Sequence, residues 1–348
     1  MTDLSSHIIL HTSDARTALQ KLNELPLTPA LFVVDEEGKL IGMLSDSDIR
    51  NGLLNDLPLS TPVSTFAQAS SFVLKKGSYT VADIQAIRQA GGVLFPIVDE
   101  NGEILRVCNF NKQRSFLPLD VVIIAGGLGT RLQPLTNSTP KPLLSLAGKP
   151  IIAHILDRLS LFGIRHSYLS IGYKAEQFKA LLGDYTEAGL AIEYIHEETP
   201  LGTFGPIGKI KNFESDVVLV MNADLLTNID LEDMMLTFEE EEADMMVASI
   251  PYEVPIPYAI LETDGNRITE FHEKPTYTYY ANAGIYLVKK ELLKKIPVDE
   301  PYQATDLMRE LIDTNHKVCY YPILGYWLDI GTPQDYEKAK RDIAHIQF

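Results

Sequence analysis

The sequence has a deficit of positive charge and no long apolar run. Its 348 residues include 30 Lys and Arg against 47 Asp and Glu, which gives a formal net charge of −17. Because so acidic a surface repels phosphate backbones at long range, nucleic acid is not expected as a partner. No apolar run approaches the ~20 residues that a membrane-spanning helix needs, so no membrane contact is expected.

Cysteine is also scarce. The two that occur, Cys108 and Cys319, are too far apart to form a metal-binding motif or a disulfide framework. Unpaired thiols are typical of a reducing compartment. The N-terminal residues show no basic segment followed by an apolar stretch, so no signal peptide is expected. These absences predict a cytoplasmic protein, and the length predicts two or three domains.

What the first third of the sequence does contain is an internal repeat. Residues 32–41 (FVVDEEGKLI) resemble residues 96–105 (PIVDENGEIL). Each copy reads as an apolar strand, an acidic turn with glycine and a second apolar strand, which is the pattern of a β-hairpin. A helix is expected before each hairpin, the first capped by Ser13 or Asp14 and the second over 80–89. Two such units are expected to bury one face against each other.

This repeat resembles a pair of cystathionine-β-synthase (CBS) domains. The pair is expected over residues 1–115, in halves of about 1–58 and 59–115. The first copy ends in Gly-Met-Leu-Ser-Asp-Ser-Asp, which is the family's pattern. The resemblance implies that Ser45 and Asp48 contact the phosphate and ribose of an adenine nucleotide.

The second copy departs from that pattern. Alignment of the two copies puts Arg106, Asn109 and Lys112 where the first has glycine, serine and aspartate. Two roles therefore stay open for the pair, a nucleotide sensor or a module for packing and dimerisation. Residues 110–118, which are polar and end in proline, are expected to link the repeat to the next domain.

From Asp120 the pattern changes to strands that alternate with helices. Residues 121–125 (VVIIA) form a continuous apolar run, as expected of a buried parallel strand. A helix is expected to begin at Pro150 and to end at Gly163. Further strands are expected near Tyr168, Ile192 and Val217. This alternation predicts an α/β domain with a mainly parallel sheet, whose ligands lie beyond the carboxyl ends of the strands.

A glycine-rich loop follows the first of these strands. Glycines allow backbone N–H groups to approach a phosphate or a base closely. Arg131 and Lys141 follow in the same excursion, which three prolines stiffen, and cations held in this way suit a triphosphate. The loop lacks both the Gly-Lys-Ser/Thr of a P-loop and the third glycine of a dinucleotide fingerprint, so neither motif is present.

Residues 125–142 (AGGLGTRLQPLTNSTPKP) resemble the signature of the sugar-1-phosphate nucleotidyltransferases, also called nucleoside-diphosphate-sugar pyrophosphorylases. Later segments resemble further landmarks of that family, in the same order. The resemblance implies a Rossmann-like nucleotidyltransferase domain over 119–348 that is related to GT-A glycosyltransferases. It implies nucleotide binding by Ala125, Gly126, Gly127, Gly129, Thr130, Gly202 and Thr203, sugar binding by Glu273, Asn282 and Gly284, catalysis by Arg131, Lys141, Asp224 and Lys274, and Mg²⁺ binding by Asp224 and Asp329.

The implied reaction joins an NTP and a sugar 1-phosphate, and it yields an NDP-sugar and pyrophosphate. Arg131 would hold the departing phosphates, Lys141 would stabilise nearby charge and Lys274 would position the attacking phosphate. Because that phosphate is already an anion, no general base is needed, and His272 is given no role. Two carboxylates suit Mg²⁺, a hard cation that prefers oxygen ligands.

The identities of base and sugar are less readable. A CBS pair fused to this domain resembles guanylyltransferases that act on mannose or glucosamine 1-phosphate in the synthesis of surface polysaccharides. That resemblance favours GTP and leaves thymidylyl, uridylyl and cytidylyl transfer open. A homo-oligomer is expected. Phe204 replaces a residue that is small in many relatives, and it is expected to alter the pocket near the nucleotide.

Two other functions compete with this interpretation. A metal-dependent glycosyltransferase shares the fold, but such enzymes usually carry Asp-x-Asp where this sequence has Asn222 before Asp224. A catalytically silent subunit that senses nucleotides is the other alternative. Three tyrosines, Tyr277, Tyr279 and Tyr280, could line a sugar pocket or pack in the core.

Overall fold

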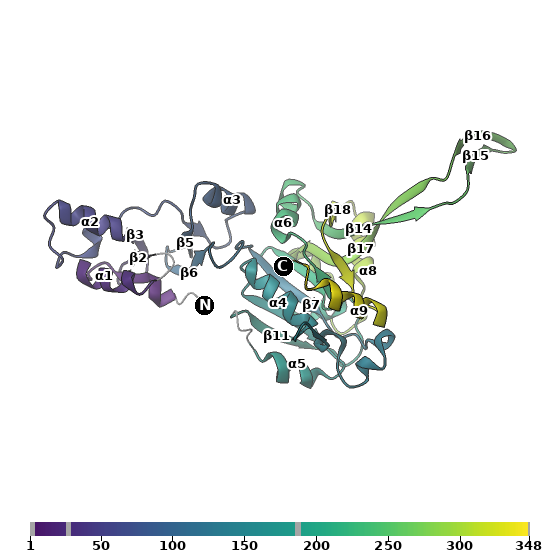
Figure 1. Ribbon diagram of the computed structural model, residues 1–348, viewed down its shortest axis with the longest axis horizontal. Helices are drawn as coiled ribbons and strands as arrows, with labels where there is room; N and C mark the ends of the chain where they lie inside the picture. The colour runs from purple at the N-terminus through teal and green to yellow at the C-terminus, as the bar shows by residue number, and fades with distance from the viewer. Residues whose placement is uncertain (1–3, 26–28, 185–188, 347–348) are drawn as a thin grey trace. The chain divides into compact units, whose positions relative to one another are not determined.

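The computed structural model describes residues 4–25, 29–184 and 189–346. The chain divides into two compact units, Met1–Pro118 with Leu159–Arg165, and Leu119–Arg158 with His166–Phe348. Figure 1 labels most of the helices and many of the strands of both. None of the described helices is long and apolar enough to cross a membrane.

The first unit contains the repeat as two similar sets of elements. The first set comprises β1 (Ile8–Leu10), α1 (Ala15–Asn23), β2 (Ala30–Val34), β3 (Leu40–Ser45) and α2 (Asp46–Leu54), with short 3-10 helices at Leu4–His7 and Val63–Thr65. The second comprises β4 (Leu74–Lys75), α3 (Val81–Gln89), β5 (Leu94–Val98) and β6 (Ile104–Asn109). Each set forms a three-stranded sheet in which a parallel pair precedes a hairpin. The predicted hairpins are confirmed, as are the helices before them, which Asp14 and Thr80 cap.

The two copies pack against each other through equivalent residues. The N–H of Leu40 donates to Gly102 O at 2.9 Å, and that of Ile104 donates to Gly38 O at 3.4 Å. The two bonds are reciprocal, because each residue of the first copy has its counterpart 64 positions later. Between the copies lies a shared apolar cluster of Ala30, Phe32, Val34, Leu94, Val98, Ile104 and Val107. The two sheets therefore bury a face against each other, as two small repeats must.

The connecting segment 110–118 forms no helix or strand, but it is not a loose linker. Phe116 is fully buried, and its ring meets that of Phe95 edge-on with centroids 5.3 Å apart. The hydroxyl of Tyr79 donates to Phe116 O at 2.9 Å. Although the segment is mostly polar, Phe116 therefore fixes it to the second copy of the repeat.

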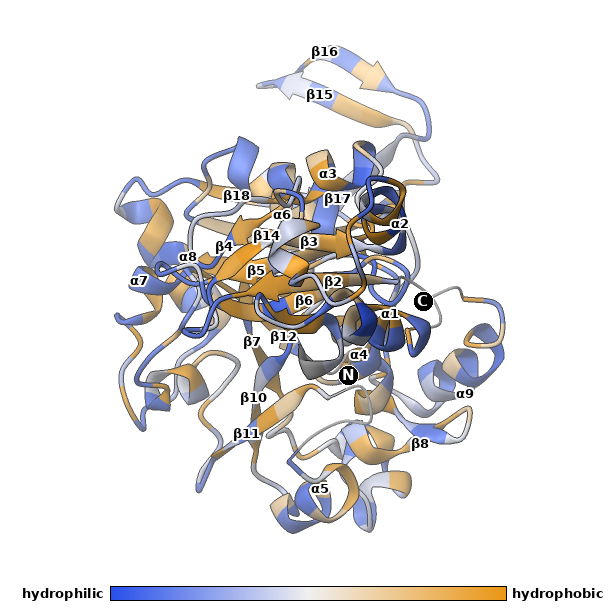
Figure 2. Cartoon of the chain, turned by 90° about the vertical axis from the view of Figure 1, so that its left-hand side faces the viewer, coloured by the Kyte–Doolittle hydropathy of each residue, from blue (hydrophilic) through white to orange (hydrophobic). Residues whose placement is uncertain are grey.

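The second unit is built on a seven-stranded sheet in the order β11-β10-β7-β12-β17-β14-β18. The strands are β7 (Leu119–Ile124), β10 (His166–Ile171), β11 (Ala191–His196), β12 (Val217–Asn222), β14 (Met245–Pro255), β17 (Thr276–Lys289) and β18 (Val318–Pro322). Only β17 runs against the others. The predicted mixed, mainly parallel α/β fold is confirmed, and Figure 2 shows the hydrophobic colouring of the central strands.

Helices accompany this sheet, and short strands lie beside it. The helices are α4 (Ile151–Leu161), α5 (Ala175–Leu182), α6 (Leu231–Glu240), α7 (Lys290–Leu293), α8 (Ala304–Asp313) and α9 (Pro333–Asp342). Two short pairs are β8 (Ser145–Leu146) with β9 (Lys149–Pro150), and β13 (Leu225–Thr227) with β19 (Trp327–Asp329). Short 3-10 helices lie at Thr130–Leu132, Leu135–Asn137, Lys141–Leu143 and Gly205–Lys209. The helix predicted from Pro150 corresponds to α4.

Phe204 lies in the core of this unit. Its side chain is fully buried and meets the ring of Tyr286 edge-on, with centroids 5.2 Å apart. The ring packs between strands and helices instead of facing solvent, and its effect on a pocket near the nucleotide stays a prediction.

An arm leaves the sheet of the second unit, and we define it as residues 250–281. The outer parts of β14 and β17 pair from Ile250 with Ala281 to Pro255 with Thr276. A terminal hairpin of β15 (Ile260–Asp264) and β16 (Arg267–His272) follows. Figure 1 shows the arm extending away from the rest of its unit, and nearly all of its side chains are exposed.

Candidate active site

The glycine loop begins directly where β7 ends. Ala125 is fixed to the neighbouring strand by its N–H, which donates to Ser170 O at 2.9 Å. A Cβ atom at Gly126 would lie 2.1 Å from Oε1 of Glu197, so a larger residue fits there only if that carboxylate moves. Gly129 has a φ of 63°, in the left-handed region that glycine adopts at low cost. The sequence therefore needs glycine at these two positions for reasons of space and backbone conformation.

The outer part of the loop faces open space. A Cβ atom at Gly127 would meet no atom within 4 Å, and Thr130, the first residue of its 3-10 helix, is exposed. The hydroxyl of Thr136 donates to Gly129 O at 2.8 Å and secures the loop from behind. The loop is therefore open to solvent at Gly127 and Thr130 and is held on its other side by Thr136.

A buried carboxylate supports the loop, and the sequence analysis missed it. Oε2 of Glu197 accepts a hydrogen bond from Leu201 N at 3.1 Å, and Oε1 accepts one from the hydroxyl of the fully buried Ser170. Glu197 lies five positions before Gly202, the first of two residues near it that the family resemblance assigns to nucleotide binding. That proximity was the only signal in the sequence, since nothing local places the carboxylate beneath Gly126.

Three predicted residues from distant parts of the chain meet in one ionic cluster. Nζ of Lys141 lies 2.5 Å from Oδ2 of Asp224 and 3.4 Å from Oδ1 of Asp329. Asp224 follows β12, and Asp329 is brought beside it because β13 and β19 pair with Leu225 opposite Asp329. The Lys141 side chain is only 9% exposed. Two acids and a buried cation therefore gather beyond the carboxyl end of a central strand, where α/β sheets bind ligands.

The electrostatics of the cluster reflect its crowding. The pKa of Asp329 is raised above its ordinary value, first by burial and then by the negative charge of Asp224, while Lys141 and Arg131 oppose the rise. The guanidinium carbon of Arg131 lies 3.5 Å from where a Cβ atom would be at Gly331. Arg131 therefore adds a second cation to the same side of the unit.

The donor set fits a divalent metal ion. Oδ1 of Asp224 is buried and has no hydrogen-bond partner among the described residues. An unpaired buried carboxylate oxygen costs free energy, so it calls for a ligand. Two carboxylates with one oxygen still unsatisfied are suitable ligands for a hard cation such as Mg²⁺.

Strand β17, which carries the predicted sugar-binding residues Asn282 and Gly284, passes beside the end of β12. Gly284 has a φ of 73°, and a Cβ atom there would lie 2.6 Å from the amide nitrogen of Asn222. The side chain of Asn282 bonds within the chain, since its oxygen accepts from Gly284 N at 2.9 Å and its amide donates to the Tyr286 hydroxyl at 3.0 Å. Gly284 therefore lies near Asp224, whereas Asn282 serves first to shape its own strand.

Gly202 and Thr203 are tied to the start of α8. A Cβ atom at Gly202, which has a φ of 78°, would lie 2.4 Å from Nε2 of Gln303. The Thr203 hydroxyl accepts from Ala304 N at 2.8 Å and donates to Oε1 of Gln303 at 3.3 Å. Both residues thus have a structural task, and their contact with a nucleotide base stays a prediction.

Glu273 and Lys274 are not brought to the ionic cluster. They lie on the arm, between β16 and β17, and both are exposed. Within the part of the chain that the structure describes, no hydrogen bond or ion pair joins either side chain to another residue. Lys274 also has a φ of 46°, which is uncommon for a residue with a side chain.

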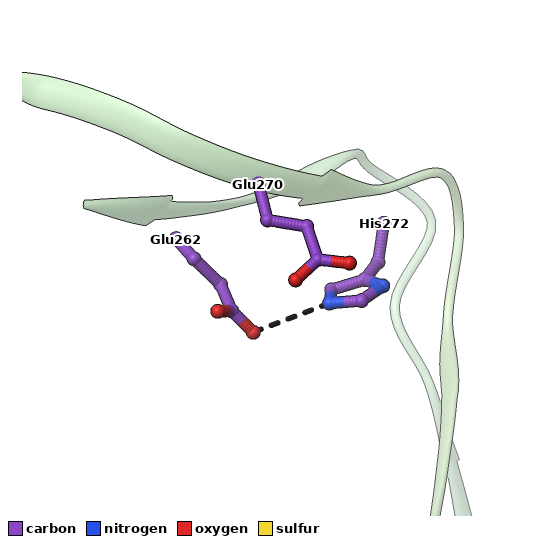
Figure 3. Close-up of side chains that lie close together, drawn as sticks. All are labelled: Glu262, Glu270 and His272. Atoms are coloured by element: carbon purple, nitrogen blue, oxygen red, sulfur yellow. Dashed lines mark hydrogen bonds and ion pairs between the residues drawn. The ribbon is translucent and has the colours of Figure 1, made fainter.

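A second charged cluster lies on the arm itself. Figure 3 shows Glu262, Glu270 and His272 close together on one face of the terminal hairpin. Glu262 and Glu270 are directly opposite each other, and Nε2 of His272 lies 3.2 Å from Oε1 of Glu262. One ligand atom from each of the three residues lies within 4.8 Å of the others, but all three side chains are exposed. The histidine thus lies beside two carboxylates that face each other across the strands, where like charges repel.

Ser45 and Asp48, in the first unit, bond to each other. The Ser45 N–H donates to Oδ2 of Asp48 at 2.8 Å, and Asp48 N donates to the Ser45 hydroxyl at 3.4 Å. These reciprocal bonds form a capping box at the start of α2. The Ser-x-x-Asp pattern therefore has a structural explanation that does not require a ligand.

Comparisons with known proteins agree with this geometry. A family model described as nucleotidyl transferase matches residues 120–346, and a CBS-domain model matches residues 6–55. The chain is 36% identical to mannose-1-phosphate guanylyltransferase of Mycobacterium tuberculosis over 238 residues, which are 65% of this chain and 65% of that protein. It is 33% identical to mannose-1-phosphate guanylyltransferase catalytic subunit beta of Drosophila melanogaster over 223 residues, or 62% of this chain and 60% of that protein.

Among solved structures, the chain resembles HddC from Yersinia pseudotuberculosis. The TM-score is 0.51 at 28% identity, and the match covers 65% of this chain and 99% of that one. A second structure of the same protein is complexed with GMP-PN, with a TM-score of 0.51 and 27% identity. The chain thus spans under two thirds of the length of the curated relatives it matches, and nearly all of this structural neighbour.

Proposed function

We propose that this chain, which belongs to the nucleotidyl transferase family, transfers a nucleotidyl group from an NTP to a sugar 1-phosphate and releases pyrophosphate. The observation that carries this proposal is the cluster of Lys141, Asp224 and Asp329 beside the glycine loop. A buried ion pair costs free energy unless it is well compensated, so a cluster with an unsatisfied carboxylate oxygen suggests a task beyond folding.

For substrates, we propose GTP with mannose 1-phosphate, and glucosamine 1-phosphate as the next sugar to test. The names of the relatives support guanylyl transfer to mannose 1-phosphate, and the GMP-PN complex of the structural neighbour supports a guanine nucleotide. The product would be a nucleotide sugar for the synthesis of surface polysaccharides or other glycans.

The residues of the cluster suit the demands of this reaction, in which two anions must be held together. We propose that backbone N–H groups of the glycine loop and Arg131 bind the triphosphate, with Arg131 on the departing phosphates. Lys141 stabilises charge at the reacting phosphorus, and Lys274 positions the attacking phosphate. Asp224 and Asp329 would hold Mg²⁺, which would neutralise phosphate charge when bound.

The proposal is tested with a matrix of GTP, ATP, UTP, CTP and dTTP against common sugar 1-phosphates, read as pyrophosphate release. We expect the highest kcat/KM with GTP and mannose 1-phosphate. Transfer from a preformed NDP-sugar without pyrophosphate chemistry would instead support the glycosyltransferase alternative. Binding of nucleotides without turnover on any pair would support the silent subunit.

A single substitution tests the site. We expect Asp224→Ala to abolish pyrophosphate release and to leave the circular dichroism spectrum unchanged, because Asp224 lies at a strand end and not in the core. Asp313→Ala serves as the control, since Asp313 is an exposed aspartate at the end of α8. Wild-type rates in Asp224→Ala would refute the assignment.

For the first unit, we propose a CBS pair over residues 1–115 whose first copy binds an adenine nucleotide, followed by the transferase domain from residue 119. The family match to residues 6–55 supports the first copy. Titration with AMP and ATP, by calorimetry and in the activity assay, tests it. No binding and no change in rate would favour the packing role. The free thiols of Cys108 and Cys319 suit the cytoplasm, which is the location we propose.

A further inference from the structure

The arm carries a large share of the chain's exposed apolar surface. Nine of the twenty-three exposed large hydrophobic side chains of the described residues lie between positions 252 and 280. They are Tyr252, Val254, Tyr258, Leu261, Ile268, Phe271, Tyr277, Tyr279 and Tyr280, each between 36% and 75% exposed. Such a concentration marks an interaction surface, because single exposed apolar residues are normally scattered.

The pairing of the strands collects part of this surface on one face. Tyr252 pairs with Tyr279, and Val254 pairs with Tyr277. Directly paired residues of an antiparallel ribbon point to the same side, as do residues two apart on one strand. These four side chains therefore form one apolar face, which we call the tyrosine face. Tyr280 points to the other side, where its ring lies 4.8 Å from that of Tyr320.

A ribbon of this kind needs a covering partner. A two-stranded hairpin is at best marginally stable in water, and it gains stability when an apolar face packs against another surface. If the tyrosine face is covered, its four partly exposed side chains would bury on the order of 300–400 Å² per copy. That is about half of the ~800 Å² per partner of a standard protein interface, and the other exposed apolar side chains of the arm add to it.

The arm also bears two residues that the proposed reaction uses. Glu273 and Lys274 are exposed on it, whereas Lys141, Asp224 and Asp329 form their cluster in the body of the unit, from which the arm extends away (Figure 1). The site of one copy is therefore incomplete in this conformation. Lys274 can hold a sugar phosphate for the reaction only beside a body with that cluster, and a second copy of this chain offers one.

We propose that the arm docks on a second copy of the chain through its tyrosine face and carries Glu273 and Lys274 to the active site of that copy. Each site of the resulting dimer then combines the body of one copy with the arm of its partner. The exchange is reciprocal, as in a two-fold symmetric dimer. This inference rests on the proposed function, since it assigns the sugar-phosphate contact to Lys274.

The test is complementation between two inactive variants of the full chain. Asp224→Ala damages the body and leaves the arm intact, whereas Lys274→Ala damages the arm and leaves the body intact. The two are produced together with different affinity tags and purified through both. If arms are exchanged, a two-fold dimer of one chain of each kind has one intact site of two, and we expect about half of the wild-type rate of pyrophosphate release.

Two results would overturn the exchange and leave the proposed function standing. One is a doubly tagged dimer as inactive as the separate variants, which means that each arm serves its own body. The other is a wild-type chain that sediments as a monomer at the protein concentration at which it is fully active. Failure of the proposed function looks different, since Asp224→Ala alone would then be active or the wild type would be inactive.

The tyrosine face is tested separately with a double variant, Tyr252→Ser with Tyr279→Ser. We expect it to shift the sedimenting species toward the monomer and to lower activity, and we expect activity to rise again with protein concentration. The control is Tyr258→Ser, which removes an exposed tyrosine from the arm but not from this face. Dimers as stable as those of the wild type in the double variant would contradict docking through the tyrosine face.

Discussion

Two charged clusters lie in the second unit, and they differ in burial. In the body, the ammonium of Lys141, whose side chain is 9% exposed, lies between Asp224 and Asp329. On the arm, His272 lies close to Glu262 and Glu270, and all three are exposed. Charges attract more strongly where solvent is excluded, and exposed pairs contribute little. Two acids and one base therefore form a candidate site in the body and only a surface cluster on the arm.

The clusters also differ in how much of the chain they require. Lys141 is 83 positions from Asp224 and 188 from Asp329, whereas ten positions separate Glu262 from His272. The first cluster assembles only when the sheet, the glycine loop and the β13–β19 pair are all in place. The second needs one hairpin. Substitutions in the two clusters, and in residues of intermediate burial, test this difference.

The largest effect is expected for Lys141→Met, which leaves two acids facing each other without their cation. Turnover should fall on the order of 10³-fold, because a preorganised charge near the reacting phosphate is lost. Stability should fall by about 2 kcal/mol, less than for a fully buried pair, because the acids are 26% and 41% exposed. Thermal melting and pyrophosphate release measure the two effects.

A cation added from solution should partly replace that lysine. We expect Mg²⁺ to raise the melting temperature of Lys141→Met more than that of the wild type, a readout independent of activity. Lys149→Met is the matched control, since Lys149 pairs with Asp157 at 2.8 Å on the surface. If Mg²⁺ raised the melting temperature of all three proteins equally, the cluster would not be the metal site.

Next in size is the effect of crowding the buried side of the loop. Gly126→Ala should cost about 2–3 kcal/mol, because its Cβ would lie 2.1 Å from Oε1 of Glu197, a buried carboxylate that two hydrogen bonds hold in place. Gly127→Ala meets nothing within 4 Å and should leave stability unchanged. Urea unfolding compares the free energies of unfolding of the two variants. Equal values would show that the Glu197 side chain can move aside at little cost.

An intermediate case is Asp244, which is 20% exposed. The hydrogen bond from Lys289 at 2.7 Å is the main reason that its pKa is lowered to about 2, with further bonds from Lys317 N and His316 and with burial acting in the opposite direction. A lowered pKa stabilises the fold above about pH 4, and that contribution is lost as the pH falls toward 2.

Asp244→Asn should therefore destabilise the chain by about 2 kcal/mol at pH 7, and the deficit should shrink between pH 4 and pH 2. Urea unfolding across that range measures it. Asp216→Asn is the control, because the carboxylate of Asp216 is 80% exposed in its pair with Lys290. A deficit independent of pH would mean that packing, and not charge, is what the substitution removes.

The smallest effect is expected on the arm. Glu262→Gln loses a weak pair with His272 but also removes a like charge opposite Glu270, so the melting temperature should change by less than about 1 °C. A loss comparable to that of Lys141→Met would show that the arm cluster is held in a less solvated setting than its exposure indicates.

Much of this fold follows from local pattern. The hairpins of the repeat, the helices before them, the cap Asp14 and the buried run that became β7 are visible in the sequence, because turns, caps and apolar periodicity act over few residues. The glycine loop and the acids at strand ends were readable for the same reason. The gathering of Lys141 with Asp329 was expected from a family resemblance, since no local pattern spans that distance.

What escaped prediction depends on tertiary context. Glu197 reads like any acid in a loop until β10 and β11 place it beneath Gly126. Tyr277 and Tyr279 alternate with polar residues as in a half-buried strand, yet the structure leaves Tyr279 61% exposed. Ser45 is the opposite case, because a short-range capping box accounts for a pattern that suggested a ligand.

The pairing of β13 with β19 has a consequence for the order of events during synthesis. Asp329 is supplied by a strand that leaves the ribosome after all the strands of the large sheet, including β18. A nascent chain can therefore form the glycine loop and the Lys141–Asp224 pair before it has its third charged group. The cluster would thus be completed only late in translation, when β19 pairs with β13.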